Sequence, residues 1–214
     1  MIAIIDYQLS NLYSVKHALD SLNAETMITS DPGVIDQAEA AILPGVGAFG
    51  DAMANLKKFK LIKPINDLIS SGRPFMGVCL GLQLLFSRSY EFGSHEGLGI
   101  IKGEVKKFPN KKINGQPIKV PQIAWNQISF TQATTSNWEK SPLRSLENNH
   151  YVYFVHSLYV KPEDKSVICS ETNYCGFDYC SSVIKKNIFA VQFHPEKSGP
   201  KGIEIYRNWL NDKI

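Results

Sequence analysis

Short apolar segments alternate with segments of helical periodicity along the first half of the chain. The apolar segments predict strands, because a strand that is buried on both faces carries apolar side chains almost without interruption. They are Ile2–Ile5, Ala40–Leu43 and Phe75–Val78, and Thr26–Thr29 can form a further strand. Between them, apolar residues recur every three or four positions, which indicates helices with one buried face. The predicted helices begin at Asn11 and Asp31 and cover Phe49–Leu56, Leu61–Ile69 and Leu80–Phe86.

After about residue 100, β-branched and aromatic segments follow one another, separated by turn residues. Strands are predicted at Ile118–Phe130, Tyr151–Val160, Ser166–Glu171, Tyr179–Ile184 and Phe189–Phe193, with turns at Asn114–Gly115 and Pro162–Glu163 and a closing helix at Ile203–Leu210. Strands that alternate with helices indicate a parallel sheet covered on both faces. The second half indicates a mixed or antiparallel extension. We therefore expect an α/β fold built on a mainly parallel central sheet.

The composition agrees with one globular domain that spans residues 1–214. Apolar residues make up 43% of the chain, and 23 basic against 20 acidic residues leave a net charge of +3, which is too small to indicate nucleic-acid binding. No run approaches roughly 18 apolar residues and no basic segment opens a signal peptide, so we expect a cytosolic protein without a membrane span. Cys169, Cys175 and Cys180 form no C-x-x-C pattern, and neither a metal site nor a disulfide is expected.

Cys79 is the candidate nucleophile, because the segment Gly77–Gly81 (GVCLG) follows a predicted strand and precedes a predicted helix. This is the strand–turn–helix elbow of the G-x-S-x-G hydrolases, with cysteine in place of serine. A tight elbow leaves no room for a Cβ on either side, which explains both glycines. The positive end of the helix favours the thiolate, and the amide of Leu80 points towards an oxyanion at the substrate carbon. A buried structural cysteine is the alternative interpretation.

His194 is the candidate base, and a third group must orient it. It follows the predicted strand Phe189–Phe193 and precedes Pro195, which favours extended backbone at residue 194. In an extended segment the side chains of residues i and i+2 point to the same side, so that Glu196 can accept a hydrogen bond from the imidazole. A surface loop with solvated charges is the alternative. His156 lies in a predicted aromatic strand, where a core or cleft histidine is as good an interpretation as a catalytic one.

A glycine-rich loop, Gly45–Gly50 (GVGAFG), follows the third predicted strand and allows two interpretations. Its sequence matches the G-x-G-x-x-G fingerprint of dinucleotide-binding proteins. Against this, the loop follows at least two strands, and no acidic residue ends a strand about 20 residues later, since Asp67 lies in a predicted helix. The other interpretation is an oxyanion loop, in which glycines allow a peptide N–H to turn towards the reaction centre.

Taken together, these motifs resemble class I glutamine amidotransferases, and within them the glutaminase subunits of imidazole glycerol phosphate synthase. The matching segments follow the family's order along the whole chain: Ile5–Tyr7, Asn11–Leu12, Leu43–Phe49, Gly77–Phe86, Glu96–Gly99, Val120–Pro121, Trp125–Asn126, Tyr153–Ser157 and Gln192–Gly199. The resemblance implies a flavodoxin-like three-layer sandwich. It also implies a triad of Cys79, His194 and Glu196 that hydrolyses glutamine to glutamate and ammonia.

The resemblance further implies roles for residues around this triad. The oxyanion hole would be formed by Gly45, Val46, Gly47 and Leu80. The substrate glutamine would be bound by Gln83, Glu91, His156 and Ser157. The ammonia would pass to a (β/α)₈ cyclase subunit, and the surface that meets this partner would include Asn11, Gln122, Trp125, Asn126 and Lys197. No cofactor, nucleic acid or membrane is implied.

Four positions depart from the family's pattern. Gln8 and Ser10 stand where glycines are often found, and Gln122 and Ala124 stand where histidine and glycine are common. All four lie in segments tied to partner contact, so the acceptor of the ammonia stays open. It is either the cyclase of histidine biosynthesis or a synthase that aminates a nucleotide-linked sugar for surface polysaccharide. A stand-alone cysteine hydrolase and a dinucleotide-binding module are further alternatives.

Overall fold

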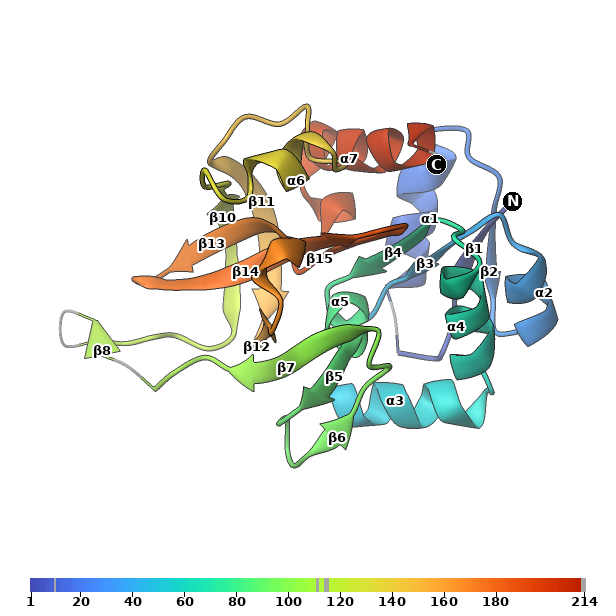
Figure 1. Ribbon diagram of the computed structural model, residues 1–214, viewed down its shortest axis with the longest axis horizontal. Helices are drawn as coiled ribbons and strands as arrows, with labels where there is room; N and C mark the ends of the chain where they lie inside the picture. The colour runs from blue at the N-terminus through green and yellow to red at the C-terminus, as the bar shows by residue number, and fades with distance from the viewer. Residues whose placement is uncertain (10, 111, 114–115, 213–214) are drawn as a thin grey trace.

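The computed structural model describes residues 1–9, 11–110, 112–113 and 116–212. Its centre is a twisted sheet with helices packed on both faces (Figure 1). One half of the sheet is parallel, with the strand order β2-β1-β3-β4-β15. These strands are β1 (Ile2–Ile5), β2 (Thr26–Thr29), β3 (Ala40–Leu43), β4 (Phe75–Val78) and β15 (Ile188–Val191). Because β15 takes the fifth place, this is the 2-1-3-4-5 order of flavodoxin-like sheets, and the expected parallel core is confirmed.

Side chains alternate along the parallel strands between two hydrophobic cores. On β1, Ile2 and Ile4 pack in one core, whereas Ala3 and Ile5 pack in the other. The first core holds the apolar faces of α1 (Leu12–Asp20) and α7 (Gly199–Asn211), and the second holds those of α2 (Pro32–Gln37), α3 (Phe49–Lys58) and α4 (Ile62–Ser70). Figure 1 shows α1 and α7 on one side of the sheet and α3 and α4 on the other. The expected three-layer sandwich is therefore confirmed.

The other half of the sheet is mostly antiparallel, as expected. It runs from β15 through β14, β12, β7 and β5 to β6, and β13 pairs with β14. The bounds are β5 (Phe86–Ser89), β6 (His95–Glu96), β7 (Ile101–Lys107), β12 (Leu158–Pro162), β13 (Ile168–Tyr174) and β14 (Phe177–Lys185). Two separate hairpin-like pairs are β10 (Gln122–Ile128) with β11 (His150–His156), and β8 (Lys112–Ile113) with β9 (Gln116–Pro117). In Figure 1, β8 lies near the end of an arm that leaves the sheet.

Several predicted elements differ from the observed ones in their bounds; the strand predicted over Ile118–Phe130, for example, is the shorter β10 (Gln122–Ile128). The strand predicted over Tyr151–Val160 is interrupted at Ser157, and its halves, β11 and β12, belong to different sheets. The helix predicted over Leu80–Phe86 is the shorter α5 (Leu80–Leu84), because Phe86 already begins β5. The apolar pattern continues through this junction, and only the pairing of β5 with β7 ends the helix. Long-range pairing of this kind is not visible in a short window of sequence.

Further elements between residues 86 and 139 were not predicted as such from the pattern. The polar composition of these elements resembles that of loops; they are the strands β5, β6 and β7 and the short helix α6 (Thr135–Glu139). The turn predicted at Asn114–Gly115 lies outside the described residues. Within those residues, every helix is too short or too polar to cross a lipid bilayer.

The carboxyl ends of the parallel strands place the candidate residues at one edge of the sheet. The glycine-rich loop follows β3, Cys79 follows β4, and His194 comes shortly after β15, before the 3₁₀ turn η2 (Pro195–Lys197). In open α/β sheets, ligands bind in the crevice outside these ends. The chain order of the strands therefore brings residues 45, 79 and 194 together although they are far apart in sequence.

Candidate active site

Cys79 occupies a strained backbone position at the junction of β4 and α5. Its backbone angles are φ 55° and ψ −107°, a region that L-residues rarely adopt and that costs of order 1–3 kcal/mol. The surrounding hydrogen bonds hold it there: its N–H donates to the carbonyl oxygen of Val191 at 2.8 Å, and its own carbonyl accepts from the N–H of Leu82 at 3.1 Å. Strain that is fixed in this way is typical of a nucleophile elbow.

The two glycines of the elbow are required by close contacts, as expected. A Cβ added to Gly81 would lie 1.7 Å from the carbonyl oxygen of Leu43 in β3. One added to Gly77 would lie 3.0 Å from the Cβ of Ala190 in β15 and 3.0 Å from the backbone of Gly81. Neither glycine can carry a side chain unless a strand or the helix moves, so the interpretation of GVCLG as a tight elbow is supported by packing.

His194 and Glu196 form a buried pair beside this elbow. The Nδ1 atom of His194 lies 2.7 Å from Oε1 of Glu196, and the two side chains are 2% and 0% exposed. The carboxylate also accepts hydrogen bonds from Nδ2 of Asn11 at 3.1 Å and from the hydroxyl of Tyr206 at 3.3 Å. Three donors thus hold Glu196, and it in turn orients the imidazole. Asn11, which the family resemblance placed at the partner surface, is partly buried and contacts the Glu196 carboxylate, and its role in partner contact stays a prediction.

The imidazole of His194 is held in its charged form. Burial disfavours this form, but the nearby Cys79 sulfur and the hydrogen-bonded Glu196 carboxylate outweigh burial and raise the pKa of His194 to about 10. The other ring nitrogen, Nε2, is buried and has no hydrogen-bond partner of ordinary geometry in the described part of the chain. It is therefore free to exchange a proton with Cys79 or with a bound substrate.

A second polar side chain reaches the sulfur of Cys79. Nε2 of Gln192 lies 3.6 Å from Sγ as a donor. Its orientation is fixed by Gln83, whose Nε2 donates to Oε1 of Gln192 at 3.0 Å and to the carbonyl oxygen of Leu158 at 3.3 Å. Gln192 was not among the residues predicted for the site. The available signal was its position two residues before His194, which places both side chains on one side of an extended segment.

A pocket of about 270 Å³ opens above Cys79. Its lining combines the elbow, the glycine-rich loop and the end of β11, and consists of Val46, Gly47, Cys79, Leu80, Gln83, Glu91, Pro121, Val155, His156, Ser157 and Leu158. All four residues predicted to bind the substrate line this pocket. Two carry charge or amide groups suited to a small polar ligand: Glu91, which also accepts the N–H of Phe49 at 2.6 Å, and Gln83.

The glycine-rich loop is not arranged as an oxyanion hole in this structure. The N–H of Leu80 donates to the carbonyl oxygen of Gly45 at 3.4 Å, and the N–H of Val46 donates to the carbonyl oxygen of Leu9 at 3.1 Å. Both candidate donors are therefore occupied by backbone acceptors. Gly47 has φ +105°, a conformation that favours glycine, so the loop has the backbone freedom that a rearrangement needs.

His156 is a neutral wall of the pocket. Its Nδ1 lies 2.7 Å from the carbonyl oxygen of Leu158 and its Nε2 lies 3.1 Å from the hydroxyl of Tyr179. Burial lowers the pKa of His156 to about 4. A histidine that stays uncharged at neutral pH and has both nitrogens engaged is a poor general base, so the triad is left with His194.

The residues predicted for partner contact are placed unequally. Trp125 on β10 is 52% exposed, and Lys197 in η2 is exposed. Asn126 is half-buried and donates to a backbone carbonyl of β13 at 2.9 Å. Gln122, in contrast, is fully buried and its side-chain oxygen accepts from the hydroxyl of Tyr179 at 3.0 Å. A direct contact between this side chain and a partner does not fit its burial.

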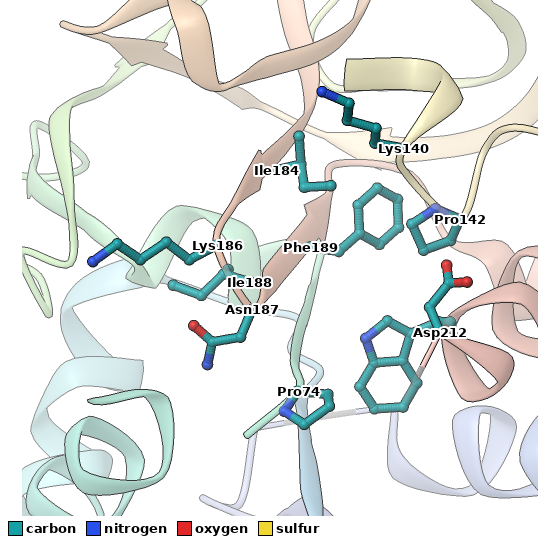
Figure 2. Close-up of a pocket in the computed structure, with 10 residues that line it drawn as sticks. Pro74, Lys140, Pro142, Ile184, Lys186, Asn187, Ile188, Phe189 and Asp212 are labelled. Carbon is teal, nitrogen blue, oxygen red and sulfur yellow. The ribbon is translucent and has the colours of Figure 1, made fainter. Parts of the chain in front are cut away.

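Figure 2 shows a different cavity, at the opposite end of the sheet from Cys79. Pro74 and Phe189, which lie at the amino ends of β4 and β15, line it together with Pro142 and Trp209. Its volume of about 20 Å³ is enough for roughly one water molecule. It holds no cluster of nucleophilic groups, and the pocket above Cys79 is the better candidate for chemistry.

Comparison with known proteins agrees with this geometry. The family model described as glutamine amidotransferase class-I matches residues 3–213. The chain is 44% identical to imidazole glycerol phosphate synthase subunit HisH of Geobacter metallireducens, over 99% of this chain and 98% of that protein, and 45% identical to the protein of the same description from Aquifex aeolicus, over 96% and 94%.

Solved structures share the fold at low sequence identity. PurLQS from Thermotoga maritima superimposes with a TM-score of 0.70 at 19% identity, covering 98% of this chain and 97% of that one. The glutaminase domain of CTPS from Trypanosoma brucei, solved with bound acivicin, has a TM-score of 0.62 at 14% identity and covers 100% and 94%. At these sequence identities the structural similarity supports only a shared fold.

Proposed function

The chain belongs to the class I glutamine amidotransferase family, and we propose that it works as the glutaminase subunit of an imidazole glycerol phosphate synthase in histidine biosynthesis. Residues 1–214 would form one amidotransferase domain. The observation that carries the chemistry is the buried set of Cys79, His194 and Glu196 at the carboxyl ends of β4 and β15. The pathway is supported by relatives of 42–45% identity over nearly the whole chain.

Each triad residue has a definite task in the proposed reaction. The Cys79 thiolate attacks the side-chain amide carbon of glutamine, and the electrons of the C=O bond move onto oxygen. When the carbon–nitrogen bond breaks, His194 donates a proton to the departing ammonia and a γ-glutamyl thioester remains. His194, held by Glu196, then takes a proton from water as the water hydrolyses this thioester to glutamate. The charged state of His194 supports the first transfer.

The pocket supports glutamine as the substrate. Glu91 offers a carboxylate for an ammonium group, and Gln83, whose Nε2 already donates to Gln192 and Leu158, offers its Oε1 as an acceptor. Both face the cavity that begins at Cys79. The oxyanion would be stabilised by the N–H groups of Leu80 and Val46, which requires the loop around Gly45 to change its present hydrogen bonds. Loss of one such donor typically lowers the rate by 10²–10³.

The ammonia needs an acceptor site on another polypeptide, and we propose a (β/α)₈ cyclase subunit as that partner. An apolar face on the β10–β11 pair supports a docking surface, since Ile123 is 60% exposed, Trp125 52% and Tyr151 54%. Large apolar side chains gathered on one face are typical of interfaces. Exposed Lys197 follows the triad carboxylate directly in sequence, so the same surface would reach close to the active site.

The triad is tested with Cys79→Ala in the complex with its cyclase partner. We expect glutamine hydrolysis to fall by more than about 10⁴-fold, whereas synthesis from added ammonia continues, because the acceptor site is untouched. Cys175→Ala removes an exposed thiol and serves as the matched control. Full glutaminase activity in Cys79→Ala would refute the assignment. Failure of the wild-type gene to rescue a strain that lacks the histidine-pathway subunit, despite good expression, would refute the pathway.

A further inference from the structure

The hydroxyl group of Tyr7 is buried and has no hydrogen-bond partner within the described residues. Tyr7 follows β1, is fully buried and packs in the core beneath α3 and α4. Burial raises the pKa of Tyr7 far above its ordinary value of 10, and the charges of Cys79 and Asp6 raise it further. The group is therefore a neutral donor at any working pH. A buried donor without an acceptor costs free energy, which points to an acceptor in another state of the molecule.

The hydroxyl lies against the peptide that blocks the oxyanion hole. A Cβ added to Gly45 would come within 1.8 Å of the Tyr7 oxygen and within 3.1 Å of the Cβ of Leu80. Tyr7 thus touches the Cα of the residue whose carbonyl oxygen accepts the N–H of Leu80. That hydrogen bond, at 3.4 Å, is longer than the usual 2.7–3.2 Å for N–H···O, so it is weak.

The oxyanion hole proposed above requires this weak bond to break. A rotation of the peptide between Gly45 and Val46 frees the N–H of Leu80 and turns the N–H of Val46 towards the pocket. The same rotation leaves the carbonyl oxygen of Gly45 without a donor. The structure therefore holds a donor without an acceptor, Tyr7, beside Gly45, the residue whose carbonyl would lose its donor when the hole forms.

We propose that the Tyr7 hydroxyl donates to the carbonyl oxygen of Gly45 in the rearranged loop and so stabilises the formed oxyanion hole. Tyr7 is then a positioning residue, since its full burial keeps it away from the substrate. The proposal rests on the glutaminase function proposed above. The hydroxyl then has a hydrogen-bond acceptor in the catalytic state but none in the resting state. This difference between the two states can be tested.

The test is Tyr7→Phe in the full chain, assembled with the cyclase partner. We expect kcat for glutamine hydrolysis to fall about tenfold, equivalent to about 1.4 kcal/mol, with KM unchanged. Alkylation of Cys79 by iodoacetamide should proceed at the wild-type rate, because the thiolate displaces iodide at a saturated carbon and no oxyanion forms. The melting temperature should stay the same or rise, since the resting state loses a hydroxyl that has no partner there.

Tyr179→Phe serves as the matched variant, and different results would overturn the role of Tyr7 and the proposed function. Tyr179→Phe removes a hydroxyl that contacts both His156 and Gln122, and it should lower the melting temperature. An unchanged kcat in Tyr7→Phe overturns the proposal. A fall in kcat that is accompanied by a fall in the alkylation rate or in the melting temperature also overturns it, because Tyr7 would then have a purely structural role. If wild type and Cys79→Ala hydrolyse glutamine equally well, the proposed function fails, whatever Tyr7→Phe does.

Discussion

Gly81→Ala tests whether the elbow depends on close packing between β3 and α5. The added Cβ would lie 1.7 Å from the carbonyl oxygen of Leu43, whereas real Cβ atoms stay at least 3.0 Å from such atoms. The backbone must therefore open by 3.0 minus 1.7, or about 1.3 Å. An added methyl group in a packed core costs about 1–3 kcal/mol. Because the obstacle is backbone and not a flexible side chain, we expect about 3 kcal/mol, which lowers Tm by roughly 6–12 °C in a chain of this size.

The measurement is urea and thermal unfolding of wild type, Gly81→Ala and a control, Gly33→Ala. Gly33 lies in α2, and a Cβ there meets only Oδ1 of the exposed Asp31 at 3.3 Å. Alanine is favoured over glycine in a helix by up to about 1 kcal/mol, so the control should change stability little or raise it. Equal stability of the two variants would refute the argument from close approach. Gly81→Ala should also lose glutaminase activity at temperatures where it is still folded, because the shift moves Leu80.

Two further predictions concern groups around the nucleophile. Gln192→Leu removes the amide nitrogen that lies 3.6 Å from Sγ of Cys79. Because hydrogen bonds to charged groups contribute about 1.5–3 kcal/mol, this variant should slow the alkylation of Cys79 by iodoacetamide roughly tenfold at pH 7. An unchanged alkylation rate would contradict the prediction. Burial lowers the pKa of His156 to about 4 from 6.5, so between these values the unfolded chain binds a proton that the folded chain does not. The neutral, buried His156 therefore contributes about 3 kcal/mol to the free energy of unfolding above pH 6.5, and this contribution is lost as the pH falls to about 4. Urea unfolding at pH 7 and pH 4 should show a smaller loss in His156→Gln; an equal loss would contradict the prediction.

The parts of the fold that could be predicted are those whose pattern is local. Each of the first four parallel strands was predicted at its observed bounds; in β1, β3 and β4, burial on both faces leaves an apolar run in the sequence itself, whereas the edge strand β2 is partly exposed. Cys79 was found for a similar reason, since two glycines at fixed spacing report a close approach. His194 and Glu196 were found through the geometry that proline imposes on an extended segment. In each case the physical cause acts within a few residues.

The parts that were missed depend on contacts between distant segments. Gln192 is functional only because Gln83, from another element, turns its amide towards Cys79. Tyr7 stands out only when its hydroxyl is found beside Gly45 and without a partner. Strand β5 exists because β7 pairs with it. The position of Gln192 two residues before His194 is a spacing in the chain, but the contacts of Gln83, Tyr7 and β7 leave no periodicity or spacing from which they could be predicted.

The nucleophile and the oxyanion hole differ in how firmly the fold holds them. Among the residues that the structure describes, eight non-glycine residues have positive φ, and seven of them are exposed; only Cys79 is buried. Its strained conformation is maintained by β15 through Val191 and by the close approach at Gly81, so it is fixed before any substrate arrives. The loop at Gly45 is held towards Leu80 by one long hydrogen bond. The proposed reaction therefore requires the loop to rearrange, whereas Cys79 can stay in place.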